Sequence, residues 1–418
     1  MTDTTRPSIG RSDDPGLKLR AEQFASLLAQ DRVAWVADRR YMKKLGGGGQ
    51  GSVLLAERRG AAGFRIPVAI KFFSPRPFRT VEEYDQEMQR LAEVSAMVAR
   101  IQHDHLVAVH TFIEDGGIFF MEMEWIDGFD MLHILRRDTL EIVQDAVTER
   151  RWANITERVI TTGEVDCRLK PGMAVAVIRA CLEGTAALHR GGVIHCDLKP
   201  SNVMVKRTGQ VKIIDIGSAY WVGRPPQGQP CTLEYAAPEV LVGYRASPQS
   251  DLASLGYMLL EMLTGSKPFA GLHYGELRAA KQSLPDRLPA LLPTDAFAFS
   301  EHLITFMRRL IHPDPNRRFP SAEDAELSDE GAAGFLKQLV LSELSSEYAS
   351  EMRQWITEME TDIVRRYAAE NDDDDLAAGD GTTRIVPPLL PLTQAMDAQE
   401  GESPSAHEHD FDLDEDFQ

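Results

Sequence analysis

Residues 195–217 constrain the fold of this chain more than any other stretch. They carry a carboxylate, an amine and an amide at short, fixed spacing, in Asp197, Lys199 and Asn202. A short β-branched and apolar run then leads to a second carboxylate, Asp215. Phosphoryl transfer needs such a set: one carboxylate orients the acceptor hydroxyl, a lysine neutralises the moving phosphoryl group, and an amide and a second carboxylate hold metal ions. The stretch therefore predicts a phosphoryl-transfer site.

This spacing resembles the catalytic and metal-binding loops of the eukaryotic-type, bacterial-like Ser/Thr protein kinases. The resemblance covers residues 41–321, with Cys196 in place of the Arg of the family's His-Arg-Asp motif. It implies an α+β fold of two lobes, a small β-rich lobe with one helix and a large, mainly helical lobe. It also implies ATP and Mg²⁺ as cofactors, with Mn²⁺ as the alternative metal. The implied catalytic residues are Asp197 and Lys199, and the implied metal ligands are Asn202 and Asp215.

A segment reading LGGGGQGSV matches the family's G-x-G-x-x-G-x-V pattern through Gly46, Gly48, Gly51 and Val53. Glycines at such positions let backbone N–H groups approach nucleotide phosphates without an intervening Cβ. A flexible hairpin between two strands would give the same local composition. The phosphate-binding interpretation gains weight from the tetrapeptide VAIK that ends at Lys71, because it matches the family's phosphate-pairing strand lysine.

In this family the strand lysine pairs with a carboxylate on the next helix. Residues 81–101 have the apolar pattern of a helix and contain two candidates, Glu87 and Glu93. Glu87 is favoured, because a Tyr three residues before it and a Leu four residues after it resemble the family's helix. Glu93 lies nearer to the following strand but has a poorer apolar pattern around it. We expect an ion pair between Lys71 and Glu87, on an unusually long helix.

Residues 117–128 resemble the fifth strand and the hinge of the family. The resemblance makes Met123 the gatekeeper and assigns backbone groups of Glu124 and Ile126 to the adenine edge. The two faces of the adenine would be covered by three apolar side chains, Val53, Ala69 and Met204. The same residues would serve equally well as core residues in a protein without a nucleotide.

Three later segments resemble the large lobe of the family. Residues 231–239 match the end of the activation segment, residues 251–256 match a buried helix, and residues 314–318 match the closing D-P-x-x-R motif. The resemblance implies a buried ion pair between Glu239 and Arg318. Breaking such a pair from one side costs about 3–5 kcal/mol, so we interpret it as structural.

The negative charge is concentrated at the end of the sequence. Residues 370–418 contain 15 acidic residues and one basic residue, Arg384, so they carry −14 of the net charge of −19. The folded part is only weakly acidic, which argues against nucleic acid as its partner.

We find no apolar run of membrane-spanning length, no signal peptide and no C-x-x-C spacing. We therefore expect a cytoplasmic protein with reduced thiols and no membrane span.

The resemblance implies a kinase-like domain, and the composition of the remaining residues defines the flanking segments. We expect the domain over residues 40–325, with the small lobe over 40–128 and the large lobe over 129–325. The flanking segments are a disordered terminus over residues 1–16, a helix over 17–39, a helical extension over 326–370 and an acidic, disordered tail over 371–418.

Two segments carry open alternatives. Residues 133–171 are longer than the family usually needs and contain paired arginines, for which a solvated insertion is favoured over a docking surface for a protein substrate. In the tail, Thr382 and Thr383 precede Ile385 and Val386, an arrangement that resembles sites accepted by phosphothreonine-reading forkhead-associated domains. An unmodified linker is the alternative.

Three functions compete: an active kinase acting on Ser or Thr of a protein substrate, an inactive kinase-fold scaffold, and a small-molecule phosphotransferase of the aminoglycoside-kinase type. The active kinase is favoured over the scaffold, because every group with a chemical role is present. It is favoured over the small-molecule enzyme, because Lys199, the activation segment and the Glu239–Arg318 pair occur together.

Cys196 also predicts how activity is controlled. In family members switched by activation-loop phosphorylation, the Arg before the catalytic Asp receives the phosphate as a charge-assisted pair. A thiol cannot supply that cation. Between Gly217 and Thr232 the only hydroxyls are those of Ser218 and Tyr220, beside the metal loop. We expect activity that does not depend on phosphorylation of this loop.

Overall fold

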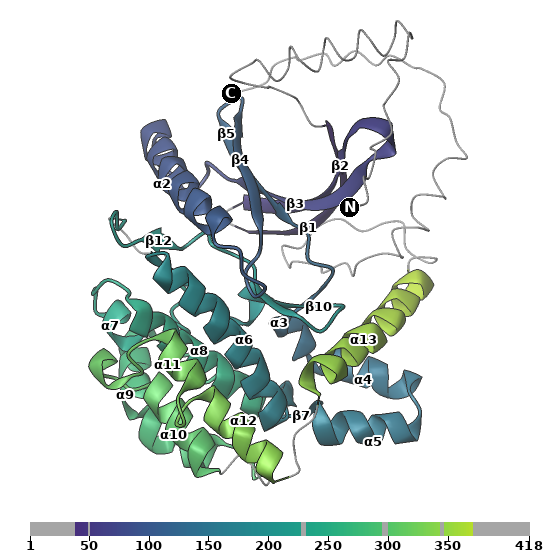
Figure 1. Ribbon diagram of the computed structural model, residues 1–418, viewed down its shortest axis with the longest axis vertical. Coiled ribbons are helices and arrows are strands. Elements are labelled where there is room, and N and C mark those ends of the chain that lie inside the picture. The colour runs from purple at the N-terminus through teal and green to yellow at the C-terminus, as the bar shows by residue number, and fades with distance from the viewer. Residues whose placement is uncertain (1–37, 49–50, 227–230, 295–299, 343–346, 371–418) are drawn as a thin grey trace, which may run out of the picture.

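The computed structural model describes residues 38–48, 51–226, 231–294, 300–342 and 347–370 (Figure 1). A β-rich part and a mainly helical part make up these residues, which confirms the predicted two-lobed α+β fold. The predicted terminus over residues 1–16 and the tail over 371–418, with Thr382 and Thr383, lie outside the described residues. So does the helix predicted over 17–39, except for Asp38 and Arg39, which begin a strand instead.

The small lobe is built on an antiparallel sheet with strand order β1-β2-β3-β5-β4. Side chains alternate between the two faces of a strand. In β3, Val68 and Ile70 therefore join one apolar cluster, while Ala69 and Phe73 join the main core. Lys71 shares the face of Ala69. The strands are β1 (Asp38–Gly48), β2 (Gly51–Arg59), β3 (Arg65–Phe73), β4 (Val109–Asp115) and β5 (Ile118–Glu124).

Helix α2 (Val81–Arg100) lies where the sequence predicted a helix and packs on the small lobe. The Thr80 hydroxyl caps its first turn by accepting a hydrogen bond from Glu83 N–H at 3.1 Å. Leu91, Val94 and Val98 recur at helical spacing and are buried. This apolar stripe sets the rotation of the helix and so decides which polar side chains reach the active site.

Short strands lie between the two lobes and position residues 195–217. A sheet of order β11-β10-β6 lies at the hinge, and β9 pairs with β12 of the activation segment. Residues 195–217 thus run between two paired strands, through a 3₁₀ turn at Pro200–Asn202. The strands of this region are β6 (Gly128–Asp130), β9 (Val193–Ile194), β10 (Val203–Lys206), β11 (Val211–Ile213) and β12 (Tyr220–Trp221). Two further strands, β7 (Ile160–Thr162) and β8 (Cys167–Leu169), pair with each other within the large lobe.

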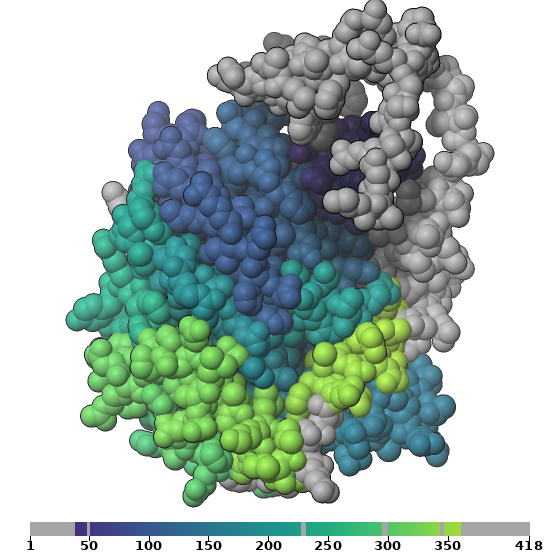
Figure 2. Space-filling view, in the orientation of Figure 1, coloured from purple at the N-terminus to yellow at the C-terminus, as the bar shows by residue number. Residues whose placement is uncertain are grey.

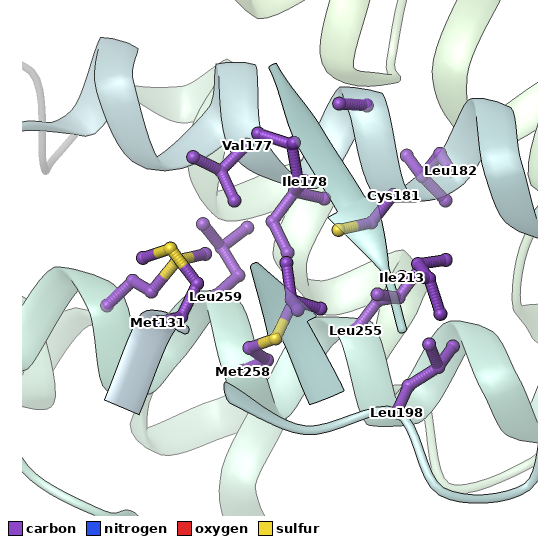
Figure 3. Close-up of a cluster of buried hydrophobic side chains, with 14 of the residues drawn as sticks. Met131, Val177, Ile178, Cys181, Leu182, Leu198, Ile213, Leu255, Met258 and Leu259 are labelled. Atoms are coloured by element: carbon purple, nitrogen blue, oxygen red, sulfur yellow. The ribbon is translucent and has the colours of Figure 1, made fainter. Parts of the chain in front are cut away.

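The core of the large lobe is formed by α6 (Pro171–Arg190) and α8 (Pro248–Thr264). Figure 3 shows Ile178 and Cys181 of the first helix facing Leu255 and Met258 of the second. Among the described residues only α6 has the length and apolarity of a membrane-crossing helix, but 83% of that window is buried inside the protein. The other helices are α3 (Met131–Ile134), α4 (Arg137–Ala146), α5 (Glu149–Arg158), α7 (Pro238–Leu241), α9 (Tyr274–Leu291), α10 (Glu301–Leu310), α11 (Ala322–Leu327), α12 (Ala332–Leu341) and α13 (Tyr348–Glu370).

The insertion over residues 133–171 packs against the C-terminal helix α13, and the two lie side by side in Figures 1 and 2. Arg151 of α5 donates to the Glu358 carboxylate of α13 at 2.7 Å and 3.1 Å and contacts Glu351 at 3.3 Å. Trp355 of α13 is fully buried. One of the paired arginines of the insertion is therefore engaged by a helix of the same chain.

Candidate active site

A buried carboxylate of α8 fixes the backbone of the loop that carries Asp197. Asp251 accepts hydrogen bonds from the N–H groups of His195 and Cys196, each at 2.9 Å, and contacts His189 Nε2 at 2.9 Å. These bonds hold Cys196 at φ 68°, a conformation that is uncommon for a residue with a Cβ. Burial would raise the pKa of the Asp251 carboxyl, but the two histidines outweigh this effect and its pKa is lowered. The ionised carboxylate can therefore accept all of these bonds.

The predicted catalytic side chains converge on one hydroxyl group. Asp197 Oδ2 lies 2.8 Å from Lys199 Nζ and 3.1 Å from Asn202 Nδ2. The Thr232 hydroxyl donates to Asp197 Oδ1 at 2.7 Å and accepts from Lys199 Nζ at 2.7 Å. A hydroxyl thus lies between a carboxylate within reach of its proton and an ammonium group. This is the geometry that general-base activation of an alcohol requires.

Sequence reasoning assigned no role to Thr232. The residue belongs to the recognised motif at residues 231–239, but it lies 35 positions from Asp197 in the chain. Nothing in a local pattern indicates that two such distant residues touch. Only the folded structure shows that Thr232 contacts Asp197 and Lys199.

Asn202 and Asp215 form a donor set that suits Mg²⁺. Asn202 Nδ2 donates to Asp197 O at 2.8 Å, which leaves the side-chain oxygen as the ligand atom. Asp215 Oδ1 accepts from Gly217 N–H at 2.8 Å. Burial would raise the pKa of the Asp215 carboxyl, but the charge and hydrogen bonds of Lys71 outweigh this effect and its pKa is lowered. An ionised carboxylate and an amide oxygen are ligands that Mg²⁺ prefers, so these residues fit the metal.

The predicted ion pair between Lys71 and Glu87 is wrong. Lys71 Nζ lies 2.7 Å and 2.8 Å from the two carboxylate oxygens of Asp215. Glu87 instead pairs with Arg90 of the same helix, at 2.6 Å and 2.9 Å. In the part of the chain that the structure describes, Lys71 is therefore held by Asp215 and by no carboxylate of α2.

Both candidate carboxylates have partners other than Lys71. Glu87 lies four and seven residues before the buried Leu91 and Val94, on the apolar side of the helix, and is half-buried, whereas Glu93 is exposed. Glu93, the alternative candidate, pairs with Arg224 of the activation segment. Arg90, the partner of Glu87, is buried and also donates to Ala219 O at 2.5 Å and to Gly217 O at 3.4 Å. Arg90 therefore joins α2 to the residues that follow Asp215. Lys71 does not take part in this contact, because it binds Asp215 itself.

The apolar residues expected around adenine lie on the neighbouring strands β2, β3 and β5 of the small-lobe sheet and on β10. Ala69 pairs with Met123 between β3 and β5, and Val53 pairs with Lys71 between β2 and β3. Met204 of β10 packs on the same apolar cluster. The hinge is anchored through the Glu124 carboxylate by two lysines of β10 and β11, Lys206 and Lys212, each at 2.9 Å. Ile126, the other expected hinge residue, is buried.

One glycine of the glycine-rich segment is required by close packing. Gly51 has a φ of 147°, and a Cβ there would lie 1.8 Å from Phe72 O. A Cβ at Gly46 would meet none of the described residues within 4 Å, so their packing does not require glycine there. Gly48 ends β1, and the two residues between it and Gly51 lie outside the described residues.

Cys196 joins the catalytic loop to the activation segment through apolar contacts. It belongs to a small buried cluster with Ile194, Tyr220 and Ala246. Tyr220 pairs with Ile194 between β12 and β9, and its hydroxyl donates to Ala246 O at 2.5 Å. In family members with an arginine at the position of Cys196, that arginine binds a phosphate on the activation loop. Here Cys196 packs against apolar side chains, and β9 pairs with β12 beside it.

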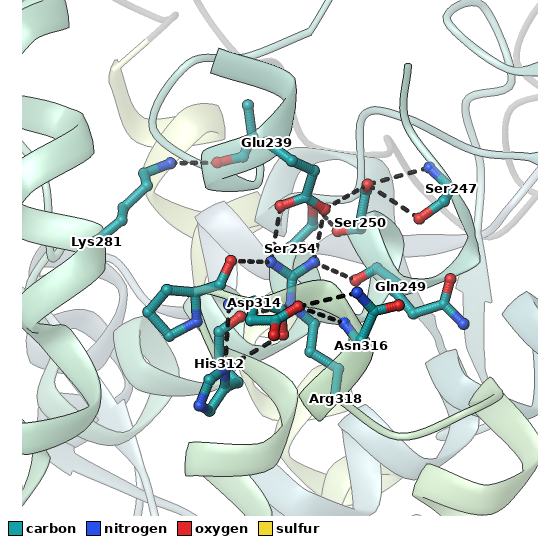
Figure 4. A network of polar contacts seen from close by, with 12 residues as sticks. Glu239, Ser247, Gln249, Ser250, Ser254, Lys281, His312, Asp314, Asn316 and Arg318 are labelled. Carbon is teal, nitrogen blue, oxygen red and sulfur yellow. Dashed lines mark hydrogen bonds and ion pairs between the residues drawn. The ribbon is translucent and has the colours of Figure 1, made fainter. Parts of the chain in front are cut away.

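The ion pair predicted between Glu239 and Arg318 is confirmed (Figure 4). Two parallel hydrogen bonds join them, at 2.7 Å and 2.8 Å, and the Arg318 side chain is fully buried. Arg318 also donates to His312 O at 2.7 Å and to Gln249 O at 2.8 Å. Burial would raise the pKa of the Glu239 carboxyl, but Arg318 outweighs this effect and lowers it.

Comparison with known proteins agrees with this geometry. The family model described as the protein kinase domain matches residues 39–327. The hormonally up-regulated neu tumor-associated kinase of Homo sapiens is 27% identical over 263 residues, which are 62% of this chain and 32% of that protein. Serine/threonine-protein kinase pkn2 of Myxococcus xanthus is 27% identical over 318 residues, 73% of this chain and 34% of that protein.

A third relative, serine/threonine-protein kinase PknA of Mycobacterium tuberculosis, is 29% identical over 235 residues, 54% of this chain and 47% of that protein. Each of these matches therefore spans less than half of the relative's own length. The family model, by contrast, covers well over half of this chain and includes the whole catalytic stretch. The chain belongs to the protein kinase family.

Proposed function

We propose that this protein transfers the γ-phosphoryl group of ATP to Ser or Thr hydroxyls of a protein substrate. The observation that carries the proposal is the Thr232 hydroxyl, held at 2.7 Å from both Asp197 Oδ1 and Lys199 Nζ. A substrate hydroxyl in that place would lose its proton to the carboxylate, while the ammonium group offsets charge on the phosphoryl group. The names of two bacterial relatives, both serine/threonine-protein kinases, support the same class.

The nucleotide would lie between the lobes. The glycine-rich segment would cover its phosphates, and Lys71 would move from Asp215 to the α- and β-phosphates. Asp215 and Asn202 would then hold Mg²⁺, which supplies charge neutralisation at the phosphates. Mn²⁺, which accepts the same oxygen ligands, is the alternative metal.

The test is a radiolabelled-ATP assay on the purified chain with Mg²⁺ and a generic basic protein, followed by acid hydrolysis and phosphoamino-acid separation. The expected products are phosphoserine and phosphothreonine. ATP binding without any transfer would support the scaffold alternative. Transfer only to an aminoglycoside would support the small-molecule alternative, and either result would overturn the proposal.

Activity that is independent of activation-loop phosphorylation is a further part of the proposal. It rests on Cys196, which packs against Tyr220 in an apolar cluster and offers no cation to a phosphate. The β9–β12 pair supports an ordered loop in the unphosphorylated chain. Phosphatase treatment of dilute enzyme should leave its initial rate on an exogenous substrate unchanged. A loss of tenfold or more, traced to phosphate on Ser218, Tyr220 or Thr232, would contradict this.

A phosphothreonine-reading forkhead-associated domain is proposed as a partner, through Thr382 or Thr383 of the tail. The sequence alone motivates this proposal, and mass spectrometry of the autophosphorylated chain tests it. Phosphate on either threonine is expected, and the absence of phosphate between residues 380 and 391 would contradict the proposal.

A cytoplasmic location and a role in signalling are likewise proposals, which cell fractionation and substrate identification would test.

A further inference from the structure

Four consecutive carbonyl groups beside the active site accept hydrogen bonds from two buried side chains. Lys281 of α9 donates to the first, second and fourth of them, at 2.8 Å and 3.0 Å for the first two. Ser254 of α8 donates to the third at 2.8 Å. The carbonyl groups are those of Leu233, Glu234, Tyr235 and Ala236. Two helices of the large lobe thus fix the backbone of residues 233–236.

The setting of Lys281 is unusual for a charged side chain. It is fully buried, and its ammonium group lies 4.6 Å and 4.7 Å from the ring centroids of Tyr257 and Phe269. Figure 4 shows it beside Glu239 and the polar network of Arg318. Burial of a charge is costly unless hydrogen bonds compensate it. Burial lowers the pKa of the Lys281 ammonium group to about 7. The three carbonyl groups that accept from Lys281 compensate this cost, so the buried amine is tied to the segment that it binds.

That segment continues directly from the residue at the catalytic carboxylate. Thr232 N–H and the Thr232 hydroxyl both donate to Asp197 Oδ1. The next residue, Leu233, is 42% exposed, and Glu234 is exposed as well. A peptide whose hydroxyl took the place of the Thr232 hydroxyl at Asp197 would have its flanking residues near these two exposed side chains. The position of residues 233–236 decides whether such a peptide fits.

We propose that Lys281 is a positioning residue for the acceptor substrate. It holds residues 233–236 in the shape against which the peptide around the acceptor Ser or Thr lies. It touches neither the acceptor nor the nucleotide, and it acts through the backbone carbonyl groups. This inference rests on the proposed function, because it assigns Lys281 to the acceptor side of that reaction.

The test compares the full chain with its Lys281→Met variant, which keeps most of the length of the side chain and removes the amine that donates to the carbonyl groups. Initial rates are measured against a basic protein acceptor and against ATP, together with ATP hydrolysis in the absence of acceptor. The acceptor KM should rise by about tenfold or more, while the ATP KM and acceptor-free hydrolysis change by less than about twofold. Arg278→Met, at an exposed position of the same helix, is the matched control and should change none of them.

Two results would overturn the proposal: an unchanged acceptor KM, or equal losses of acceptor-directed and acceptor-free turnover. Hydrogen exchange of the amide groups of residues 233–240 gives a second readout that needs no activity. Faster exchange confined to these residues is expected in Lys281→Met, and unchanged exchange would contradict the account. If the wild-type chain transfers no phosphate, the proposed function is wrong. Hydrogen exchange then still shows whether Lys281 orders residues 233–236. Should Lys281→Met not fold, Ser254→Ala takes its place in both measurements, with the same expected direction.

Discussion

The two ion pairs predicted from the sequence had opposite outcomes. Glu239 and Arg318 form a bidentate pair in the large lobe, with the arginine fully buried. Lys71 and Glu87 do not pair in the small lobe, where the lysine binds Asp215 and the glutamate binds Arg90. The same kind of resemblance predicted both pairs, so the difference lies in how the chain positions the partners.

Each partner of the large-lobe pair sits in a short motif with a locally determined backbone. Glu239 follows a helix-starting proline, and Arg318 follows a 3₁₀ turn that the Asp314 side chain caps. The small-lobe pair depends instead on how a 20-residue helix lies against the sheet, and Arg90 of that helix binds Glu87 in place of Lys71. One residue turns a helix by about 100°, so a shift of one position moves a side chain to another face. Pairs between short motifs are thus predicted more safely than pairs between a strand and a long helix.

The largest effect is expected from breaking the large-lobe pair. Arg318→Ala leaves the Glu239 carboxylate buried without its partner and also deprives two carbonyl groups of a donor. It should lower the free energy of unfolding by about 3–5 kcal/mol, as measured by urea denaturation. Arg317→Ala, at the exposed neighbouring position, is the matched control and should change it by less than about 0.5 kcal/mol. Equal effects of the two substitutions would show that the pair is not structural.

A smaller effect is expected from Arg90→Met, which removes the cation that joins α2 to the activation segment. Ala219 O and Gly217 O lose a charged donor, and Glu87 loses its partner. Hydrogen bonds from charged groups contribute about 1.5–3 kcal/mol each at most, so a stability loss of about 1–3 kcal/mol is expected, with a lower kcat. Arg100→Met, at the exposed end of the same helix, is the control. A normal kcat in Arg90→Met would separate this contact from catalysis.

Acid should weaken the large-lobe pair in a defined pH range. The pKa of Glu239 is lowered in the folded protein from an ordinary value of 4.5, so the unfolded chain binds its proton first as the pH falls. The contribution of Glu239 is complete above about pH 4.5 and is lost as the pH falls through the folded-state pKa, by at most about 1.4 kcal/mol per pH unit. The stability difference between wild type and Glu239→Gln, followed by denaturation from pH 7 to pH 3, should shrink only in this acid range. A difference that shrinks at neutral pH would contradict the assignment.

The smallest effect is expected from Glu87→Gln. The Glu87 side chain is 29% exposed and pairs only with Arg90 among the described residues, and such a pair contributes less than about 1 kcal/mol. The kcat/KM for ATP should therefore change by less than about fivefold. Glu93→Gln, at an exposed position of the same helix, is the matched control. A hundredfold loss confined to Glu87→Gln would show that this carboxylate reaches Lys71 in the nucleotide complex.

Local spacing predicted what lies close together in the chain. Asp197, Lys199 and Asn202 fall within six positions, and a loop held by Asp251 brings them together as expected. Long-range contacts left no local pattern in the sequence. Lys281 lies 45 to 48 positions from the carbonyl groups that it binds.

The insertion shows the same limit over a longer distance. Arg151 lies 207 positions from Glu358, so its pairing with α13 could not be predicted from the composition of residues 133–171. Its arginines are equally consistent with a solvated surface, a docking surface and an internal contact. Only the path of the folded chain distinguishes these three.

The central claim is that Asp197 activates the acceptor hydroxyl and that no helix carboxylate is needed to hold Lys71. The most direct test is the initial rate of radiolabel transfer from ATP to a basic protein by wild type, Asp197→Ala and Glu87→Gln, with ATP affinity measured in parallel. Asp197→Ala should bind ATP normally and be about 10²- to 10⁴-fold slower, whereas Glu87→Gln should stay within about fivefold of wild type. Near-normal transfer by Asp197→Ala, or a loss in Glu87→Gln as large as that expected for Asp197→Ala, would contradict the account.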